Sequence, residues 1–226
     1  MSKVYLVLIG LFFLSQARGQ SGPFLSQHIP PVNGSVNIVV SNLEENDGDS
    51  YFADAEKNER RGDLNDAITL YGKAAFEYNS SKKFTQYGSA LLRLANVHYL
   101  LAHYSEAEQV TLNVALKTYS KIGSKSGQME SYSQLGKIYF AADKLTQSLW
   151  FYTQQGILAK QISDNNAYID SILGIVQVKT KKKEYSLALR DLNKAELLAK
   201  SSNLNRFKTQ IREARAQIPA KVIAKK

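Results

Sequence analysis

Apolar residues recur at intervals of three and four along most of the chain, and the pattern is clearest over residues 132–155. Leu135 and Tyr139 lie four positions apart, which places them on one face of a helix. The pattern stops at residues 141–144 and restarts at Leu145. Two short amphipathic helices joined by a tight turn make a helical hairpin.

Similar hairpins recur about 40 residues apart. The second helix of each hairpin is expected to begin at Leu64, Tyr104, Leu145 and Tyr185. These residues are 40, 41 and 40 positions apart. Three residues later each copy has a small residue, namely Ala67, Ala107, Ser148 and Ala188. In the first three copies another small residue stands twelve positions before that one: Ala55, Ala95 and Gly136. In the fourth copy the small residue is Gly174, two positions farther away, so we expect a longer turn within residues 179–184.

This spacing predicts an all-α chain with a repeat domain at residues 50–202. The expected helices are 50–61, 64–79, 84–101, 104–121, 126–142, 145–162, 165–182 and 185–200. A last amphipathic helix near 203–217 would cover the apolar end of the stack, as helical solenoids require. Residues 203–226 therefore form a capping helix followed by a basic tail.

The repeat resembles the tetratricopeptide repeat (TPR). The resemblance rests on Tyr132-x2-Leu135-Gly136-x2-Tyr139, on Gly62-Asp63-Leu64-x2-Ala67 and on Tyr185-x2-Ala188. It implies a right-handed α-α superhelix of four hairpins whose first helices line a concave groove. The period of 40 residues is longer than the usual ~34 of the family. The proline that closes each repeat in the family is also absent, because all four prolines lie outside the array.

The N-terminus reads as an export signal. Residues 1–19 carry a lysine at position 3, continue with an apolar run too short to span a bilayer comfortably, and end in small residues before Gln20. An uncleaved anchor is the alternative. Residues 20–49 are rich in Ser, Gly, Pro and Asn and read as a flexible linker, with Asp49 or Ser50 capping the first helix. We therefore expect a periplasmic or secreted protein.

Charge is concentrated at the C-terminal end. Residues 179–226 hold 14 Lys or Arg against 4 Asp or Glu, whereas the whole chain has a net charge of +9. The densest basic patch comprises Lys179, Lys181, Lys182 and Lys183. Such a patch could bind nucleic acid, anionic lipid or an acidic protein. Export argues against nucleic acid, and an ordinary solvated surface remains the alternative.

The sequence offers little for catalysis. It has no cysteine, which excludes disulfides, thiolate metal sites and thiol catalysis. The two histidines of the repeat region, His98 and His103, are five positions apart and should not share a helical face. No phosphate loop, metalloprotease motif or dinucleotide fingerprint occurs. We expect no enzyme activity, no metal and no cofactor.

Binding is the remaining interpretation. By the TPR resemblance, the residues facing the concave groove would include Glu56, Arg93, Asn96, Tyr99, Gln134, Lys137 and Phe140. The alternative is that these are ordinary solvated or packed helix residues. The predicted function is a non-catalytic scaffold of the bacterial envelope that holds a protein or peptide segment. A sensor module for a small or polymeric ligand, and a binder of anionic surfaces through the basic end, are the two other hypotheses.

Overall fold

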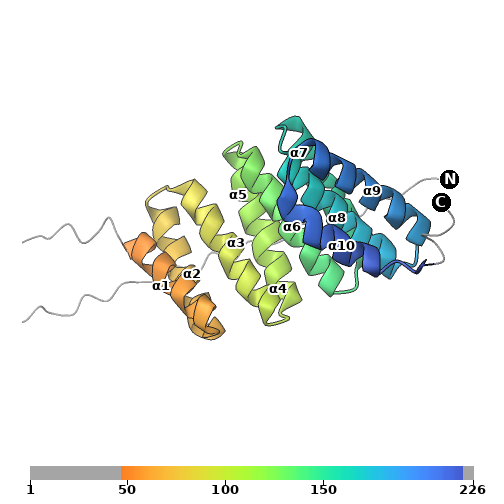
Figure 1. Ribbon diagram of the computed structural model, residues 1–226. Helices are drawn as coiled ribbons and strands as arrows, with labels where there is room; N and C mark the ends of the chain where they lie inside the picture. The colour runs from red at the N-terminus through yellow and green to blue at the C-terminus, as the bar shows by residue number, and fades with distance from the viewer. Residues whose placement is uncertain (1–46, 221–226) are drawn as a thin grey trace, which may run out of the picture. The chain divides into compact units, whose positions relative to one another are not determined.

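The computed structural model describes residues 47–220, which form a stack of antiparallel helical hairpins (Figure 1). The predicted signal peptide at 1–19, nearly all of the linker and the last six residues of the tail lie outside the described residues. The first hairpin is α1 (Asp47–Arg61) and α2 (Leu64–Ser80). The others follow in order as α3 (Phe84–Leu100) with α4 (Tyr104–Glu108), η1 (Gln109–Ala115) and α5 (Leu116–Lys121), then α6 (Lys125–Ala141) with α7 (Leu145–Gln161), and α8 (Asn165–Lys181) with α9 (Tyr185–Ser201). A short 3-10 turn, η2 (Asn205–Phe207), leads into α10 (Lys208–Ala216).

These bounds confirm the four predicted hairpins and the capping helix. The main difference at the N-terminal end is that α1 begins at Asp47, three residues before the expected start. Gly48 lies under the ring of Tyr78, whose hydroxyl donates a hydrogen bond to Asp49 Oδ1 at 2.6 Å. Asp49 is therefore a partner of the second helix and not a helix cap.

The turns explain why the boundaries follow the repeat. Each contains one residue with positive φ, and only Gly62 and Gly123 among these are glycines. The backbone N–H of Lys144 donates to the carbonyl of Tyr139 at 2.8 Å, the long hydrogen bond of a Schellman motif, and equivalent bonds close the other turns.

The expected longer turn in the fourth hairpin is wrong. Helix α8 continues to Lys181, and the turn at 182–184 has the length of the turn at 142–144. The counterpart of Gly136 is consequently Val176, not Gly174. Gly174 is small for a different reason, because it faces the ring of Tyr152 in the preceding hairpin.

The single 41-residue spacing has a local cause. The second helix of the second hairpin spans 18 residues, against 17 in each of α2, α7 and α9. The extra residue is absorbed by the π-helical segment η1, in which each backbone bond spans one residue more than in an α-helix. Beyond this segment Tyr119 is buried in the same way as Tyr78 of the first hairpin.

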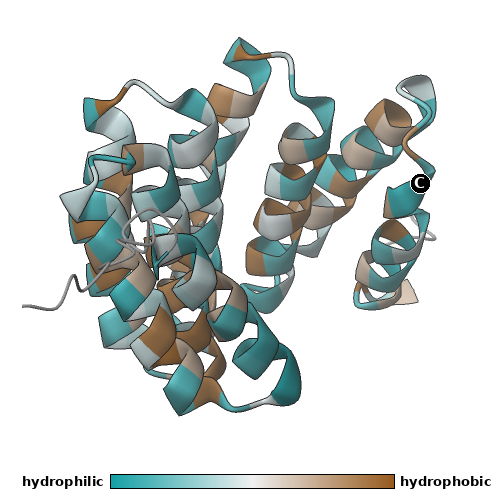
Figure 2. Cartoon of the chain, turned by 90° about the vertical axis from the view of Figure 1, so that its left-hand side faces the viewer, coloured by the Kyte–Doolittle hydropathy of each residue, from teal (hydrophilic) through white to brown (hydrophobic). Residues whose placement is uncertain are grey.

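Hydrophobic residues recur along every helix and alternate with polar ones (Figure 2). They form several buried clusters, of which some join the first two hairpins and one joins the second hairpin to the third. Tyrosines fill the places where glycine lets two helices approach. The ring of Tyr152 lies between Gly136 and Gly174, and Ser148 donates its hydroxyl to the Gly136 carbonyl at 2.8 Å. Gly136 thus stands where the second helix of its hairpin approaches the backbone of α6. At the C-terminal end, Phe207, Ile211 and Ile218 complete the core formed by α8 and α9.

Within residues 47–220, no helix combines the length and the apolar character needed to cross a membrane.

Candidate binding groove

A cavity of about 500 Å³ lies between α6, α8 and α10. Its floor is formed by Tyr152, Leu173 and Gly174. Its rim is polar and is contributed by three helices, with the side chains of Lys137, Asp170, Gln177, Gln210, Glu213 and Gln217. The cavity therefore combines an apolar base with charges of both signs and three amide groups.

The repeat itself places the rim residues. Lys137 and Gln177 each lie eight residues before the first residue of the second helix in their hairpin. Glu56 and Asn96 have the same repeat position in the first two hairpins. Lys137 and Gln177 are both exposed. The ring of Tyr152 packs against Gly174 beneath the cavity and is only 4% exposed. The capping helix α10 then closes the cavity from the C-terminal side.

The charges of the cavity offset one another. Burial raises the pKa of the Asp170 carboxyl, while Arg206 and Lys137 act in the opposite direction and do not cancel the increase. The guanidinium of Arg206 lies 3.4 Å from Asp170 Oδ2. A partner that presents both an acidic and a basic group could replace these contacts.

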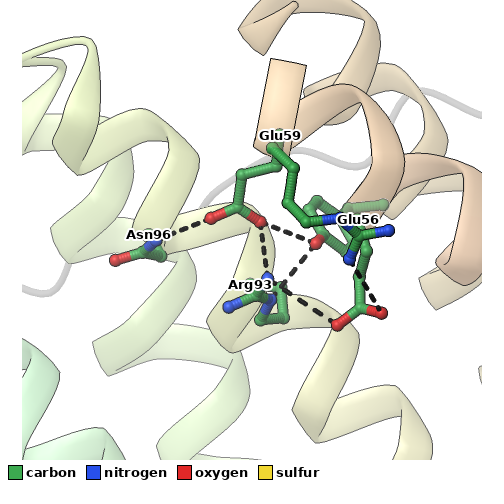
Figure 3. A network of polar contacts seen from close by, with 6 residues as sticks. Glu56, Glu59, Arg93 and Asn96 are labelled. Carbon is green, nitrogen blue, oxygen red and sulfur yellow. Dashed lines mark hydrogen bonds and ion pairs between the residues drawn. The ribbon is translucent and has the colours of Figure 1, made fainter. Parts of the chain in front are cut away.

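At the other end of the stack, several of the residues predicted to face the groove bind one another (Figure 3). Arg93 lies 2.8 Å from Glu59 Oε2 and 3.7 Å from Glu56 Oε1, so it joins α3 to α1. Asn96 donates to Glu59 Oε1 at 3.0 Å. Tyr71 completes the cluster, since its hydroxyl donates to Glu59 at 2.7 Å and accepts from Arg93 Nε at 3.1 Å.

The contacts within this cluster stabilise the fold. Burial and the hydrogen bond to Glu59 raise the pKa of the Tyr71 phenol, and Arg93 only partly opposes them. The Glu59 side chain is 11% exposed and is contacted by Tyr71, Arg93 and Asn96. Glu56, Arg93 and Asn96 therefore hold the first two hairpins together rather than standing free.

The other predicted groove residues have different surroundings. Gln134 is buried, and its amide nitrogen has no hydrogen-bond partner within the described residues. Tyr99 is half-buried beside Tyr104, with ring centroids 6.0 Å apart. Phe140 carries the ammonium of Lys181 at 4.9 Å from its ring centroid. Among the seven predicted residues, Lys137 is the one that lines the cavity.

The four lysines of the basic patch do not lie together in a lengthened turn. Lys179 is in α8, its side chain is 14% exposed, and it pairs with Asp191. Lys181 lies 2.8 Å from Asp143, and Lys182 lies 2.6 Å from Glu184. Three of the four charges are thus already paired within the described chain.

The two histidines do not share a helical face, as expected, but their rings are neighbours. Helix α3 ends at Leu100, so His103 lies in the turn and its ring comes within 5.9 Å of His98, centroid to centroid. Sequence reasoning missed the cavity residues on α8 and α10. An ungapped alignment of the fourth hairpin would have found Gln177, because it has the repeat position of Lys137.

Comparisons with known proteins identify the fold. No family model matches the sequence, and no curated protein is similar to it. Among solved structures, the apo form of RapI has a TM-score of 0.69 at 11% identity, covering 79% of this chain and 66% of RapI. BtubC (BKLC) from P. vanneervenii has a TM-score of 0.63 at 15% identity, covering 69% of this chain and 64% of BtubC. The TPR-like repeats of a putative kinesin light chain from Podosopora anserina have a TM-score of 0.58 at 13% identity, covering 80% and 97%.

The fold is a TPR-like solenoid. The chain spans about two thirds of the length of RapI and of BtubC, and identities this low support the fold alone. The TPR-like fold predicted from the repeat is confirmed.

Proposed function

We propose that this protein is a non-catalytic scaffold that holds a segment of a partner protein in the cavity between α6, α8 and α10. The cavity carries this proposal, because its apolar floor and mixed polar rim are the composition of a protein-binding surface. The TPR-like fold supports it, since its first helices present side chains along one continuous concave side.

The rim indicates how a segment would be held. Lys137 and the carboxylates of Asp170 and Glu213 provide charges of opposite sign on facing helices, which would fix the direction of a bound chain. The amides of Gln177, Gln210 and Gln217 can donate and accept hydrogen bonds with peptide groups. Tyr152 and Leu173 lie at the base of the cavity and are 4% and 7% exposed, so they make its floor apolar, and most direct contacts with the segment would come from the rim.

The proposed place of action is outside the cytoplasm, in the bacterial envelope or beyond it. The support is the charged, apolar and small-residue order of residues 1–19. Comparing partner capture from envelope and cytosolic fractions of the source organism tests location and binding together.

The test is affinity capture with the chain from Gln20 and with a Lys137→Glu variant. Lys137 is exposed, so the substitution should leave the fold intact, and circular dichroism checks this. The matched control is Lys73→Glu, which reverses an exposed lysine on α2. A partner retained by the control and lost from Lys137→Glu supports the proposal. Equal capture by both variants would contradict it.

A further inference from the structure

A second cavity, of about 420 Å³, lies on the opposite face of α8 from the cavity described above. It is a groove between α7 and α9 with α8 as its floor, and we call it the α7–α9 groove. Its walls are apolar and include Leu149 and Ile157 of α7 with Ile172 and Ile175 of α8. The lining of α7 extends from Leu149 to Lys160, about 16 Å at the rise of an α-helix.

This groove exists because the fourth hairpin lacks the side chain that fills the equivalent space elsewhere. Six residues after its second helix opens, the second hairpin has Val110 and the third has Phe151, and both pack into the core of the preceding hairpins. The fourth hairpin has Asp191 at this position. Gly156 of α7 lies against α8, where an added Cβ would stand 2.7 Å from Ser171 Oγ, so α7 and α8 approach closely at the floor of the groove.

One end of the groove is cationic. The ammonium groups of Lys160 and Lys194 lie 4.9 Å and 5.3 Å from the centroid of the Tyr168 ring, which stands between them. Neither ammonium lies within 4.0 Å of a carboxylate among residues 47–220. The nearby Asp164 is occupied in capping α8, where it accepts the N–H of Ala167 at 2.9 Å.

The pKa of Tyr168 is consistent with the positive charge of the two lysines. Burial alone would raise the pKa of the Tyr168 phenol, but Lys194 and Lys160 outweigh burial, and the pKa falls below its ordinary value. The two lysines therefore stabilise negative charge at this point. The opposite end of the groove is neutral overall, because Lys179 and Asp191 form an ion pair there.

The groove suits an aliphatic chain better than a peptide. A peptide backbone would need hydrogen-bond partners, since unpaired buried peptide groups cost ~1–3 kcal/mol each. Of the three hydroxyls in the lining, those of Thr153 and Ser171 already donate, to the carbonyls of Leu149 and Tyr168, each at 2.7 Å. The third belongs to Tyr168, beside the two lysines. A hydrocarbon chain needs no such partners and would bury the exposed surface of Ile157, which is 45% exposed.

We propose that the α7–α9 groove is a binding site for an aliphatic carboxylate. Its carboxylate lies between Lys160 and Lys194, and its chain lies along the apolar side chains of α7 and α8. The length of the groove matches a saturated chain of about ten to twelve carbons. This site is separate from the concave cavity, so either proposal can fail without the other.

The test uses dodecanoate, below its micellar concentration, with the chain from Gln20 in isothermal titration calorimetry. We expect saturable binding at one site. Removing both charges in Lys160→Gln/Lys194→Gln should weaken binding at least about tenfold, because charge-assisted contacts are lost. The matched control is Lys73→Gln, since Lys73 also lies over a tyrosine, with its ammonium 5.4 Å from the Tyr51 ring centroid, but on the first hairpin. That variant should bind dodecanoate like the original chain.

A neutral chain separates the contributions of charge and burial. Dodecanol should bind the original chain about as weakly as dodecanoate binds the double variant. Absence of saturable binding, or equal weakening by the Lys73→Gln control, would overturn the proposal. Self-association of the chain that covers the groove and prevents dodecanoate from binding would assign the groove to a second copy and would overturn it as well.

Discussion

The ring of Tyr152 lies against Gly174 of the following hairpin, so close that a Cβ added to Gly174 would stand 2.6 Å from ring carbon Cδ1. The same ring also covers Gly136 of its own hairpin. Tyr152 thereby joins the third and fourth hairpins and forms part of the floor of the concave cavity. Stability and the shape of the proposed binding site depend on the same contact.

Replacing Gly174 with alanine should destabilise the protein. The clash with a buried aromatic ring costs about 1–3 kcal/mol, more than the roughly 1 kcal/mol that alanine gains over glycine within a helix. Gly72 of α2 provides the control, because a Cβ there meets nothing within 4 Å. Gly72→Ala should raise the free energy of unfolding by about 0.5–1 kcal/mol. Urea denaturation measures both, and a stabilised Gly174→Ala would refute the packing described here.

Removing the guanidinium of Arg93 should also destabilise the fold. Arg93→Ala leaves Glu59 without its nearest cation and Tyr71 without a donor, so we expect a loss of about 1–3 kcal/mol. The comparison is Arg60→Ala, which breaks an exposed contact with Glu56 at 4.0 Å and should cost less than about 0.5 kcal/mol. Thermal unfolding of the two variants tests this difference, and equal losses would show that the cluster is not structural.

The π-helical segment should tolerate the loss of one residue. Deleting the exposed Asn113 would shorten the 18-residue helix to the 17 residues of its counterparts and keep Tyr119 in register. We expect cooperative unfolding within about 1 kcal/mol of the original chain. Deleting Thr69 from the regular helix α2 should instead displace Tyr71 and Tyr78 from the core and cost several times more. Calorimetric melting distinguishes the two deletions, and equal sensitivity would contradict the assignment of η1 as an insertion.

Stability should fall on acidification partly because of His98. Burial, followed by the charge of His103, lowers the pKa of His98, and Glu106 opposes this only in part. Its Nδ1 is buried without a hydrogen-bond partner in the described chain. A base with a depressed folded pKa binds its proton more readily when unfolded, so this contribution is complete above the unfolded value of 6.5 and is lost as the pH falls below it. His98→Gln should show a smaller loss of melting temperature between about pH 8 and about pH 5, which lie more than one pH unit above and below 6.5. An unchanged loss would exclude His98 as the cause.

The repeat made the fold predictable from the sequence. Small residues such as Ala67, Ala107 and Ser148 are needed where helices cross. Their spacing therefore locates each hairpin, even where the turn contains no glycine. Ala102 adopts positive φ without being a glycine, yet the turn around it was located by its place in the repeat. In the fourth hairpin, the sequence suggests Gly174 as the small residue of the repeat. Gly174 is small because it contacts Tyr152 of the preceding hairpin, so the sequence-based alignment of this hairpin is wrong by two residues.

The site was less predictable, because it depends on contacts between distant residues. Arg93 is at a repeat position that is expected to face the groove. Only its distances to Glu56 and Glu59 show that it is already paired. The cavity also needs α10, whose Gln210 and Glu213 lie across from Lys137. No spacing within one repeat indicates that the capping helix contributes to the inner surface.

The most direct test of the proposed scaffold is site-specific photo-crosslinking in the source organism. A photoreactive residue at the exposed Gln177 would report on the concave cavity, and one at the exposed Thr69 of α2 would report on the outer side. We predict a defined protein adduct from position 177 that disappears with Lys137→Glu and is absent from position 69. Identical adducts from both positions, or none from position 177 in a folded and expressed protein, would contradict the account.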